Sequence, residues 1–243
     1  MDDKYDDKDL QRLYDEKYFS TRSRPPMWIR RGEFIIEKFH PKTVLDVGCA
    51  YGELVKALVD MGIEAYGVDG SEYAINNSDS SIQLKLFKVN LNSDKFPFDD
   101  KTFDVVGSFY SVEHIHDINF FAKELQRILK DDGIAWFLTP NEGLEQRNET
   151  DVFTNTFEEW KKIFEERGFK VAKFSPHEMM ALRGKLGKFK FYLWPKSIQN
   201  IIKKIAYDYS NTISWNDATY NVVDDKTIEV QFSMDITNTM NPS

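Results

Sequence analysis

The stretch Thr43–Leu54 constrains the fold of this chain more than any other. It begins with a short apolar run and ends in two glycines, Gly48 and Gly52, and a helix-like pattern follows over Glu53–Val59. This order predicts a buried strand, a tight turn and a helix, the geometry in which backbone can approach a bound ligand. Asp46 stands beside the turn, where a carboxylate disfavours a phosphate and favours an ammonium or sulfonium group. We therefore expect a nucleoside-like ligand that carries positive charge.

From this stretch to residue 175, strand and helix patterns alternate. Further strands are expected at Glu64–Asp69, Gln83–Val89, Phe103–Phe109, Gly133–Leu138 and Phe169–Phe174. Helices are expected at Glu53–Met61, from Glu72 onward, at Asn119–Leu129 and at Phe157–Arg167. This alternation predicts an α/β fold, a doubly wound and mostly parallel sheet with helices on both faces. In such sheets ligands bind beyond the carboxyl ends of the strands. The stretches at such ends are Asp46–Gly48, Asp69–Gly70, Asn90–Leu91 and Phe109–His114.

Four segments are expected along the chain. They are an N-terminal helical lid over residues 1–40, a ligand-binding core over 41–175, a basic and aromatic insertion over 176–225, and the last core strand with the tail over 226–243. The lid would contain an amphipathic helix from about Asp9, whose Tyr14 and Tyr18 could cover the ligand. A frayed terminus that docks on the core is the alternative reading of this segment.

A basic and aromatic stretch precedes a second helix, which is expected at Ile29–Phe39. Its arginines are Arg22, Arg24, Arg30 and Arg31. They could clamp a carboxylate or phosphate, or they could form the solvated start of the helix.

The insertion is also basic. Its cationic residues are Arg183, Lys185, Lys188, Lys190, Lys196, Lys203 and Lys204, with no acidic residue between Met179 and Tyr207. The insertion could bind an anionic substrate, a nucleic-acid backbone or a membrane surface, or it could be a solvated helical cover. After it, alternating apolar residues over Thr227–Met234 predict the last strand.

Composition sets outer bounds on the protein. With 243 residues the chain can form one large domain, or one domain with an insertion. The net charge of −8 argues weakly against nucleic acid as a partner of the whole surface. Cys49 is the only cysteine, which excludes an internal disulfide and favours a reducing compartment. We expect a cytoplasmic protein, because no secretory signal is visible and no apolar run approaches the roughly 20 residues that span a bilayer.

Several motifs occur in an order and at spacings that together identify a family. They are Val44–Gly52, the acid of Gly67–Asp69, Phe96–Phe98 ahead of Phe103–Val106, Val112–Ile115, Leu129–Gly133 and Phe157–Phe169. The chain resembles the class I S-adenosylmethionine-dependent methyltransferases, in the broad group that modifies small molecules, over roughly residues 40–175 and the last strand. The resemblance implies a seven-stranded Rossmann-like methyltransferase fold and S-adenosylmethionine as the cofactor.

The resemblance also implies roles for individual residues. Gly48 and Gly52 would leave room for the methionine part of the cofactor, and Asp46 would favour its ammonium group. Asp69 would accept hydrogen bonds from the ribose hydroxyls, and Asn90 would border the adenine. The full set expected at the cofactor is Asp46, Gly48, Cys49, Ala50, Gly52, Asp69, Gly70, Asn90, Leu91, Phe109 and Tyr110.

Two of these residues depart from the family pattern. Family members often have Asp where this chain has Asn90, whose amide oxygen could still pair with the adenine amino group. Ala50 replaces a glycine that is common in the first turn, and we expect Ala50 to keep an ordinary backbone conformation.

Methyl transfer is an in-line displacement at a sulfonium carbon, so the protein contributes chiefly alignment and the exclusion of water. A base is needed only where the accepting atom must lose a proton early, as a hydroxyl must. Glu113 and His114 are the catalytic candidates, and a structural hydrogen bond is the alternative role for His114. The residues expected around the acceptor are Tyr14, Tyr18, Trp28 and Arg30.

The leading hypothesis is methyl transfer to an O or N atom of a small molecule, with an anionic acceptor suggested by the basic insertion. One alternative is an RNA or protein methyltransferase that docks through the insertion, and another is an inactive, cofactor-binding partner subunit. Aminopropyl-transferring relatives would require an acidic acceptor pocket. A dinucleotide site would require G-x-G-x-x-G, whereas the glycines here are four residues apart. No metal site is expected, since no spacing of metal ligands is recognisable.

Overall fold

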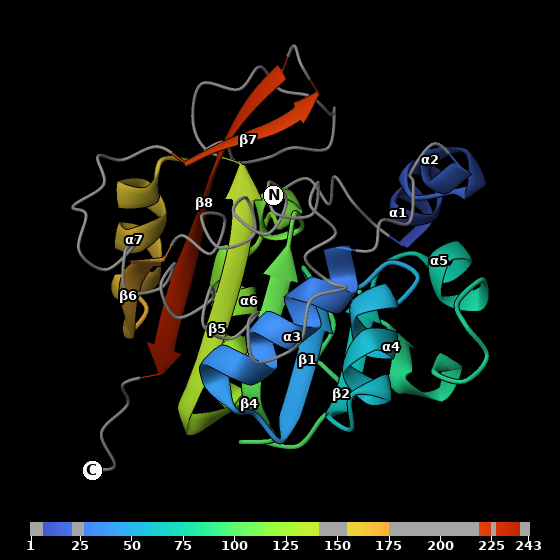
Figure 1. The fold of residues 1–243 in the computed structure, drawn as a ribbon, viewed down its shortest axis with the longest axis horizontal. Helices are drawn as coiled ribbons and strands as arrows, with labels where there is room; N and C mark the ends of the chain where they lie inside the picture. The colour runs from blue at the N-terminus through green and yellow to red at the C-terminus, as the bar shows by residue number, and fades with distance from the viewer. Residues whose placement is uncertain (1–6, 21–26, 141–154, 175–218, 225–226, 239–243) are drawn as a thin grey trace, which may run out of the picture.

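The computed structural model describes residues 7–20, 27–140, 155–174, 219–224 and 227–238 (Figure 1). Its centre is an eight-stranded sheet in the order β3-β2-β1-β4-β5-β8-β6, with β7 paired to β8 beside this path. The strands are β1 Thr43–Val47, β2 Glu64–Asp69, β3 Leu86–Lys88, β4 Phe103–Phe109, β5 Leu129–Pro140, β6 Phe169–Phe174, β7 Thr219–Asp224 and β8 Thr227–Asn238. The strands from β3 to β5 in this order run parallel, whereas β8 is antiparallel to β5, β6 and β7. The doubly wound, mostly parallel α/β sheet expected from the sequence is confirmed.

The sheet has one strand more than the seven expected. Only the second part of β8 pairs with β5, from Gln231 opposite Pro140 to Thr237 opposite Ile134. The first part extends beyond β5 and pairs with β7, which lies within the segment expected to be an insertion. Without β7, backbone N–H and C=O groups of this part of β8 would lack strand partners. The rest of the expected insertion, residues 176–218, lies outside the described residues.

Helices cover both faces of the sheet. They are α1 Asp7–Leu13, α2 Glu16–Ser20, α3 Met27–Phe39, α4 Glu53–Asp60, α5 Glu72–Asn76, α6 Ile118–Ile128 and α7 Phe157–Glu165, with single 3₁₀ turns at Gln83–Lys85 (η1) and Val112–His114 (η2). On one face, Leu58 of α4 and Val44 of β1 belong to a buried cluster that α3 completes. On the other face, Phe121 of α6 clusters with Leu45. Adjacent residues of β1 therefore pack in clusters on opposite faces of the sheet. Because both faces are covered, this strand has a continuous apolar run. None of the described helices is long and apolar enough to cross a membrane.

The strand β5 begins four residues earlier than the sequence pattern predicts. Asp131–Gly133 is an irregular part of this strand and not a separate turn ahead of it. Leu129 lies opposite Phe103 and Ile134 lies opposite Val105, so β5 advances five residues while β4 advances two. The composition Asp-Asp-Gly is typical of turns, but here the extra residues are absorbed as a bulge in a strand that stays paired on either side.

Only the first two helices have the position expected of a lid. The third helix, α3, packs beside α4 and belongs to the layer that covers the sheet. In contrast, α1 and α2 lie next to α5, near the carboxyl ends of β1 and β2 (Figure 1). The segment expected as a single lid, residues 1–40, therefore contains two parts with different neighbours.

A buried carboxylate fastens the loop before β4 to α6. Glu124 accepts a hydrogen bond from the backbone N–H of Phe96 (2.8 Å) and pairs with Arg127 at 2.7 Å. Arg127 also donates to the carbonyl oxygens of Phe96 and Phe98. Burial opposes ionisation of Glu124, but the hydrogen bonds from Arg127 and Phe96 outweigh it and hold the pKa of this carboxyl below its usual value. The ionised form of Glu124 therefore stabilises the fold.

We expect Glu124→Ala to lower the free energy of unfolding at pH 7 by about 2–4 kcal/mol, because Arg127 and the Phe96 N–H lose a buried partner. A lowered pKa in the folded state means that this stabilisation is present above the unfolded pKa of 4.5 and is lost as the pH falls through the folded pKa. The difference between wild type and variant in urea unfolding should therefore narrow below about pH 4. The exposed Glu165→Ala is the control and should change stability by less than about 0.5 kcal/mol; an equal loss in both variants would contradict this role for Glu124.

Candidate functional site

A cavity of about 220 Å³ lies at the carboxyl ends of the central strands, beneath α1 and α2. Its lining comes from four strand ends and from the first three helices. The lining residues are Leu10, Tyr14, Tyr18, Phe19, Trp28, Gly48, Cys49, Ala50, Asp69, Gly70, Asn90, Leu91, Asn92, Phe109, Tyr110, Ser111, His114 and Ile115. This set includes nine of the eleven residues expected at the cofactor; Asp46 and Gly52 are outside it. It also includes His114 and three of the four residues expected around the acceptor.

The turn between β1 and α4 is held against β2 by its own backbone. The N–H groups of Gly48 and Cys49 both donate to the carbonyl oxygen of Val68, at 2.8 and 3.1 Å. Gly48 has a φ of 75°, and a Cβ at this position would lie 2.0 Å from Oγ of Ser111. Both the conformation and the space therefore require glycine where the turn meets the end of β4.

The expectation that Ala50 keeps an ordinary backbone conformation was wrong. Its φ is 50°, in the left-handed region that favours glycine. The hydrogen bond of its N–H to Oδ2 of Asp69, at 2.7 Å, accompanies this conformation. A second residue of the cavity, Tyr110, has a φ of 61°, which is rare for a bulky side chain. Backbone strain is thus found at the ends of both β1 and β4.

Gly52 and Asp46 lie outside the cavity lining for separate reasons. A Cβ on Gly52 would meet the side chains of Ile82 and Leu86 at 2.8 Å, so this glycine allows the start of α4 to pack closely on its neighbours. Asp46 is on the face of β1 that α3 and α4 cover, and only 3% of its surface is exposed. Its nearest charged partner is Arg31 of α3.

Asp69 is fixed at the end of β2 by two backbone hydrogen bonds. Its Oδ2 accepts from Ala50 and its Oδ1 accepts from the N–H of Ser71 at 2.8 Å. A carboxylate oxygen has two lone pairs, so a carboxylate at this position has the chemistry to accept hydrogen bonds from ligand hydroxyls. The side chain lines the cavity, as a ribose-binding acid would.

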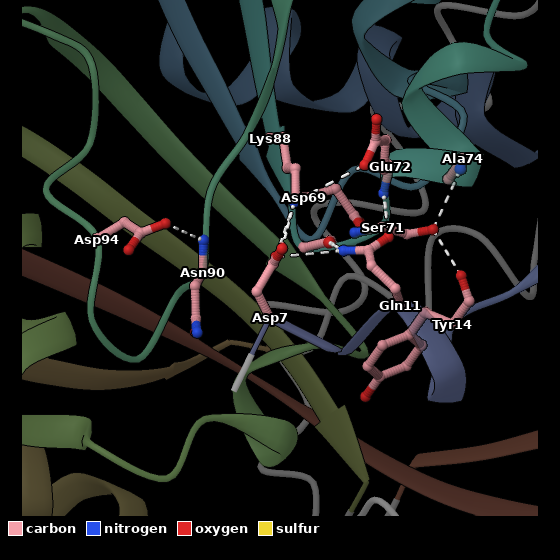
Figure 2. A network of polar contacts seen from close by, with 11 residues as sticks. Asp7, Gln11, Tyr14, Asp69, Ser71, Glu72, Ala74, Lys88, Asn90 and Asp94 are labelled. Carbon is pink, nitrogen blue, oxygen red and sulfur yellow. Dashed lines mark hydrogen bonds and ion pairs between the residues drawn. The ribbon is translucent and has the colours of Figure 1, made fainter. Parts of the chain in front are cut away.

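Asn90 and Leu91 also line the cavity, after the end of β3. The side-chain oxygen of Asn90 accepts from the N–H of Asn92 at 3.0 Å, and the backbone N–H of Asn90 donates to Asp94 at 2.9 Å (Figure 2). The amide oxygen expected to meet an adenine amino group is therefore engaged in a local turn.

Arg31 is the charged residue of this site that the sequence pattern did not single out. Its guanidinium carbon lies 4.5 Å from the ring centre of Trp28 and 4.3 Å from that of Phe109, and both rings line the cavity. The side chain is 1% exposed, and none of its nitrogen atoms has a hydrogen-bond partner among the described residues. Arg30, which was expected at the acceptor, is exposed instead. Arg31 precedes Phe34 and Ile35 by three and four residues, the helical spacing that puts it on the buried face of α3.

Burial has the largest effect on the pKa values of Asp46 and Arg31. It raises the pKa of Asp46 to about 7; the charge of Arg31 lowers it, while Asp69 and Glu53 raise it further. Burial also lowers the pKa of Arg31 to about 10, against the charges of Tyr110 and Asp46. Arg31 therefore stays charged at neutral pH, whereas Asp46 is close to half ionised.

The two catalytic candidates differ in access to the cavity. His114 lines it and lies edge-on to the ring of Tyr14, with ring centres 6.4 Å apart. Glu113 is 3% exposed and lies outside the lining. A proton acceptor for a ligand in this cavity is therefore available at His114 and not at Glu113.

A model of the methyltransferase-domain family matches residues 20–174, well over half of the chain. The chain belongs to the class I S-adenosylmethionine-dependent methyltransferases. This methyltransferase is 33% identical over 103 residues to the ubiquinone biosynthesis O-methyltransferase of Pelagibacter ubique, a match that covers 42% of this chain and 43% of the relative. The chain thus spans less than half the length of such curated relatives.

Solved structures show the same fold. A S-adenosylmethionine-dependent methyltransferase from Archaeoglobus fulgidus has a TM-score of 0.58 and 16% identity, over 91% of this chain and 99% of that one. The phosphoethanolamine N-methyltransferase 2 of Haemonchus contortus, in complex with S-adenosyl-L-methionine, has a TM-score of 0.54 and 16% identity, over 97% of this chain and 58% of that one. At these identities the likeness concerns the fold alone.

The strained turn gives a direct test. We expect Ala50→Gly to raise the free energy of unfolding by about 0.5–1 kcal/mol, because glycine adopts a left-handed φ without the cost that a Cβ imposes. Chemical denaturation at fixed pH would measure this change. The matched control is Ala57→Gly in the middle of α4, which should lower stability by about 1 kcal/mol. Destabilisation by both substitutions would show that Ala50 is not strained.

Proposed function

We propose that this protein transfers a methyl group from S-adenosylmethionine to an O or N atom of a small-molecule acceptor. The observation that carries the proposal is the single cavity in which the Gly48–Ala50 turn, Asp69 and Asn90 converge with an aromatic wall and His114. The turn, Asp69 and Asn90 have the chemistry of a site for a nucleoside and an amino-acid group. The aromatic side chains and His114 can surround an acceptor.

The residues present fit the cofactor. Asp69 would bind the ribose hydroxyls, while Asn90 and Leu91 would border the adenine. At the other end, Gly48 and Cys49 of the first turn line the cavity and would border the methionine part. The amino-acid end carries a carboxylate and an ammonium, and the buried charges nearest this end of the site are Arg31 and Asp46. The unpartnered nitrogens of Arg31 support a role toward the carboxylate.

The bound cofactor supplies an electrophilic methyl group on a sulfonium sulfur. The protein's part is to align the acceptor and to exclude water. Tyr14, which follows α1, Tyr18 of α2 and Trp28 of α3 line the cavity and can exclude solvent from it. His114 can take the proton of a hydroxyl acceptor, and an amine acceptor would leave it a structural role.

The class of acceptor is a narrower question. The relative from Pelagibacter is named an O-methyltransferase and the Haemonchus protein an N-methyltransferase, so both O and N acceptors occur among similar proteins. None of the described residues that line the cavity is Lys or Arg. The described lining thus favours an uncharged acceptor over the anionic one suggested by the sequence. The basic insertion lies outside the described residues, and its role toward the acceptor stays a prediction.

Calorimetry tests the cofactor site through the demethylated product, S-adenosylhomocysteine. The wild type should bind it, and Asp69→Ala should weaken binding more than about tenfold, because charge-assisted contacts to the ribose are lost. Asp69→Asn, which keeps an acceptor oxygen, should lie between the two. The control Asp60→Ala removes an exposed carboxylate of α4 outside the cavity and should not change affinity. Failure of the wild type to bind at millimolar concentration would reject the proposed function.

A second prediction concerns Asp46 and the ammonium group of the cofactor. In the free protein the pKa of Asp46 is raised to about 7, so at pH 6 this carboxyl is mostly protonated. A nearby ammonium favours the ionised form, so binding of S-adenosylhomocysteine should release a proton, and affinity should rise with pH until about pH 7. Calorimetry in buffers of different ionisation enthalpy measures this release.

His114 is a second ionisable side chain of the cavity, so the comparison needs two variants. Proton release should persist in His114→Gln and disappear in Asp46→Asn. The reverse result would assign the titrating group to His114 and separate Asp46 from the ligand.

A further inference from the structure

The hydrogen bonds of α1 end on the loop that directly follows Asp69 (Figure 2). Nε2 of Gln11 donates to the carbonyl oxygen of Gly70 at 2.7 Å, and Oε1 of Gln11 accepts from the N–H of Glu72 at 2.9 Å. One amide side chain thus bridges two backbone groups on either side of Ser71. Because both its donor and its acceptor are used, no other side-chain type of similar length can reproduce the bridge.

Two more contacts join the same segments. Oγ of Ser71 donates to the carbonyl oxygen of Tyr14 at 2.6 Å and accepts from the N–H of Ala74, which caps α5. Lys88 at the end of β3 pairs with Asp7 at 2.7 Å, but both side chains are exposed, so this ion pair contributes little. The hydrogen bonds of Gln11 to Gly70 and of Ser71 to Tyr14 are partly buried, so they contribute more to this attachment than the ion pair does.

The loop that receives these bonds also fixes Asp69. The N–H of Ser71 donates to Oδ1 of Asp69, and the Gly70 carbonyl between them is held by Gln11. A continuous series of contacts thus runs from α1, through residues 70–72, to the carboxylate at the cavity. Movement of α1 away from the loop would remove the hydrogen bonds of Gln11 that hold the backbone on either side of Ser71.

The same helices cover the cavity with apolar surface. Leu10 and Phe19 are buried, and both line the cavity with Tyr14 and Tyr18. The ring of Phe19 lies 5.2 Å from that of Tyr51. A ligand in the cavity would therefore lie against α1, α2 and the residues between them.

We propose that α1 and α2 form a lid whose closure is coupled to the nucleoside half of the ligand, and that Gln11 is the positioning residue that carries this coupling. The inference rests on the proposed function. The hydrogen bonds of Gln11 to Gly70 and Glu72 reach the loop beside Asp69, which would bind the ribose. They do not reach the Gly48 turn or Arg31, which would bind the amino-acid end. Because coupling is reciprocal, a nucleoside at Asp69 stabilises the closed lid, and the closed lid slows release of the nucleoside.

The test compares variants with two probes, S-adenosylhomocysteine and adenosine. Gln11→Ala should weaken both by the same factor, about 3- to 10-fold, through faster dissociation. Gln11→Glu should weaken binding of both probes at least as strongly, because the new carboxylate would face the carbonyl oxygen of Gly70 and could not donate to it. Arg12→Ala is the control on the same helix: the Arg12 side chain is exposed and pairs with Asp9 of α1, and its removal should leave both affinities unchanged. Arg31→Met should weaken S-adenosylhomocysteine and spare adenosine, which has no amino-acid end.

Hydrogen–deuterium exchange supplies a second readout, which is independent of the affinity measurements. In the wild type, either probe should slow exchange across residues 7–20, and Gln11→Ala should reduce that protection while its thermal unfolding stays near wild type.

The outcomes separate the lid from the cofactor site. If the wild type binds S-adenosylhomocysteine but Gln11→Ala binds both probes equally well, or if neither probe protects residues 7–20, the inference is overturned and the proposed function stands. If Gln11→Ala weakens binding of S-adenosylhomocysteine but not of adenosine, the proposed coupling to the nucleoside half is overturned. If the wild type binds neither probe, the proposed function fails and the inference fails with it.

Discussion

The carboxylate of Asp69 is the contact on which the candidate site depends. It joins the β1–α4 turn, through Ala50, to the loop after β2, through Ser71. The same loop receives the hydrogen bonds of Gln11 from α1. Three segments that are distant in sequence are therefore ordered around one anionic group, and each becomes less well placed when that group is lost. On the proposed function a ribose would add to this arrangement, so the ligand and the fold share one set of contacts.

The backbone around this carboxylate is strained. Ala50 and Tyr110 both have a positive φ, and both line the cavity, at the ends of β1 and β4. Left-handed conformations of residues other than glycine persist only where neighbouring contacts impose them. For Ala50 the bond to Asp69 is such a contact, and for Tyr110 it is the 2.7 Å hydrogen bond of its N–H to the carbonyl oxygen of Leu138. Strain at both sides of a cavity, within an otherwise regular sheet, is typical of a functional site.

The sheet could be predicted from the sequence because its central strands contain apolar runs, and a glycine, an acid or an amide marks the ends of β1, β2 and β3. The residues that set contacts between segments could not. Arg30 and Arg31 are adjacent and identical, and only the register of α3 buries one and exposes the other. Gln11 lies 59 residues from the glycine it contacts, and nothing in its local pattern indicates a partner. The left-handed φ of Ala50 depends on Asp69, which is 19 residues away. Local pattern thus specified the elements and the ends at which a ligand binds, whereas side-chain roles depended on tertiary neighbours.

The burial of Arg31 and Asp46 lowers the stability of the fold at the candidate site. A guanidinium that is buried without hydrogen bonds costs stability, and the rings of Trp28 and Phe109 recover only part of that cost, since such cation–π contacts contribute about 0.5–2 kcal/mol each. The carboxylate of Asp46 is likewise held at a raised pKa by burial. An apolar pair of similar volume would stabilise the same helix–strand contact better. On the proposed function the two charges are retained because a zwitterionic amino-acid group needs one of each sign, so the unfavourable burial in the free protein becomes a source of affinity once that group is bound.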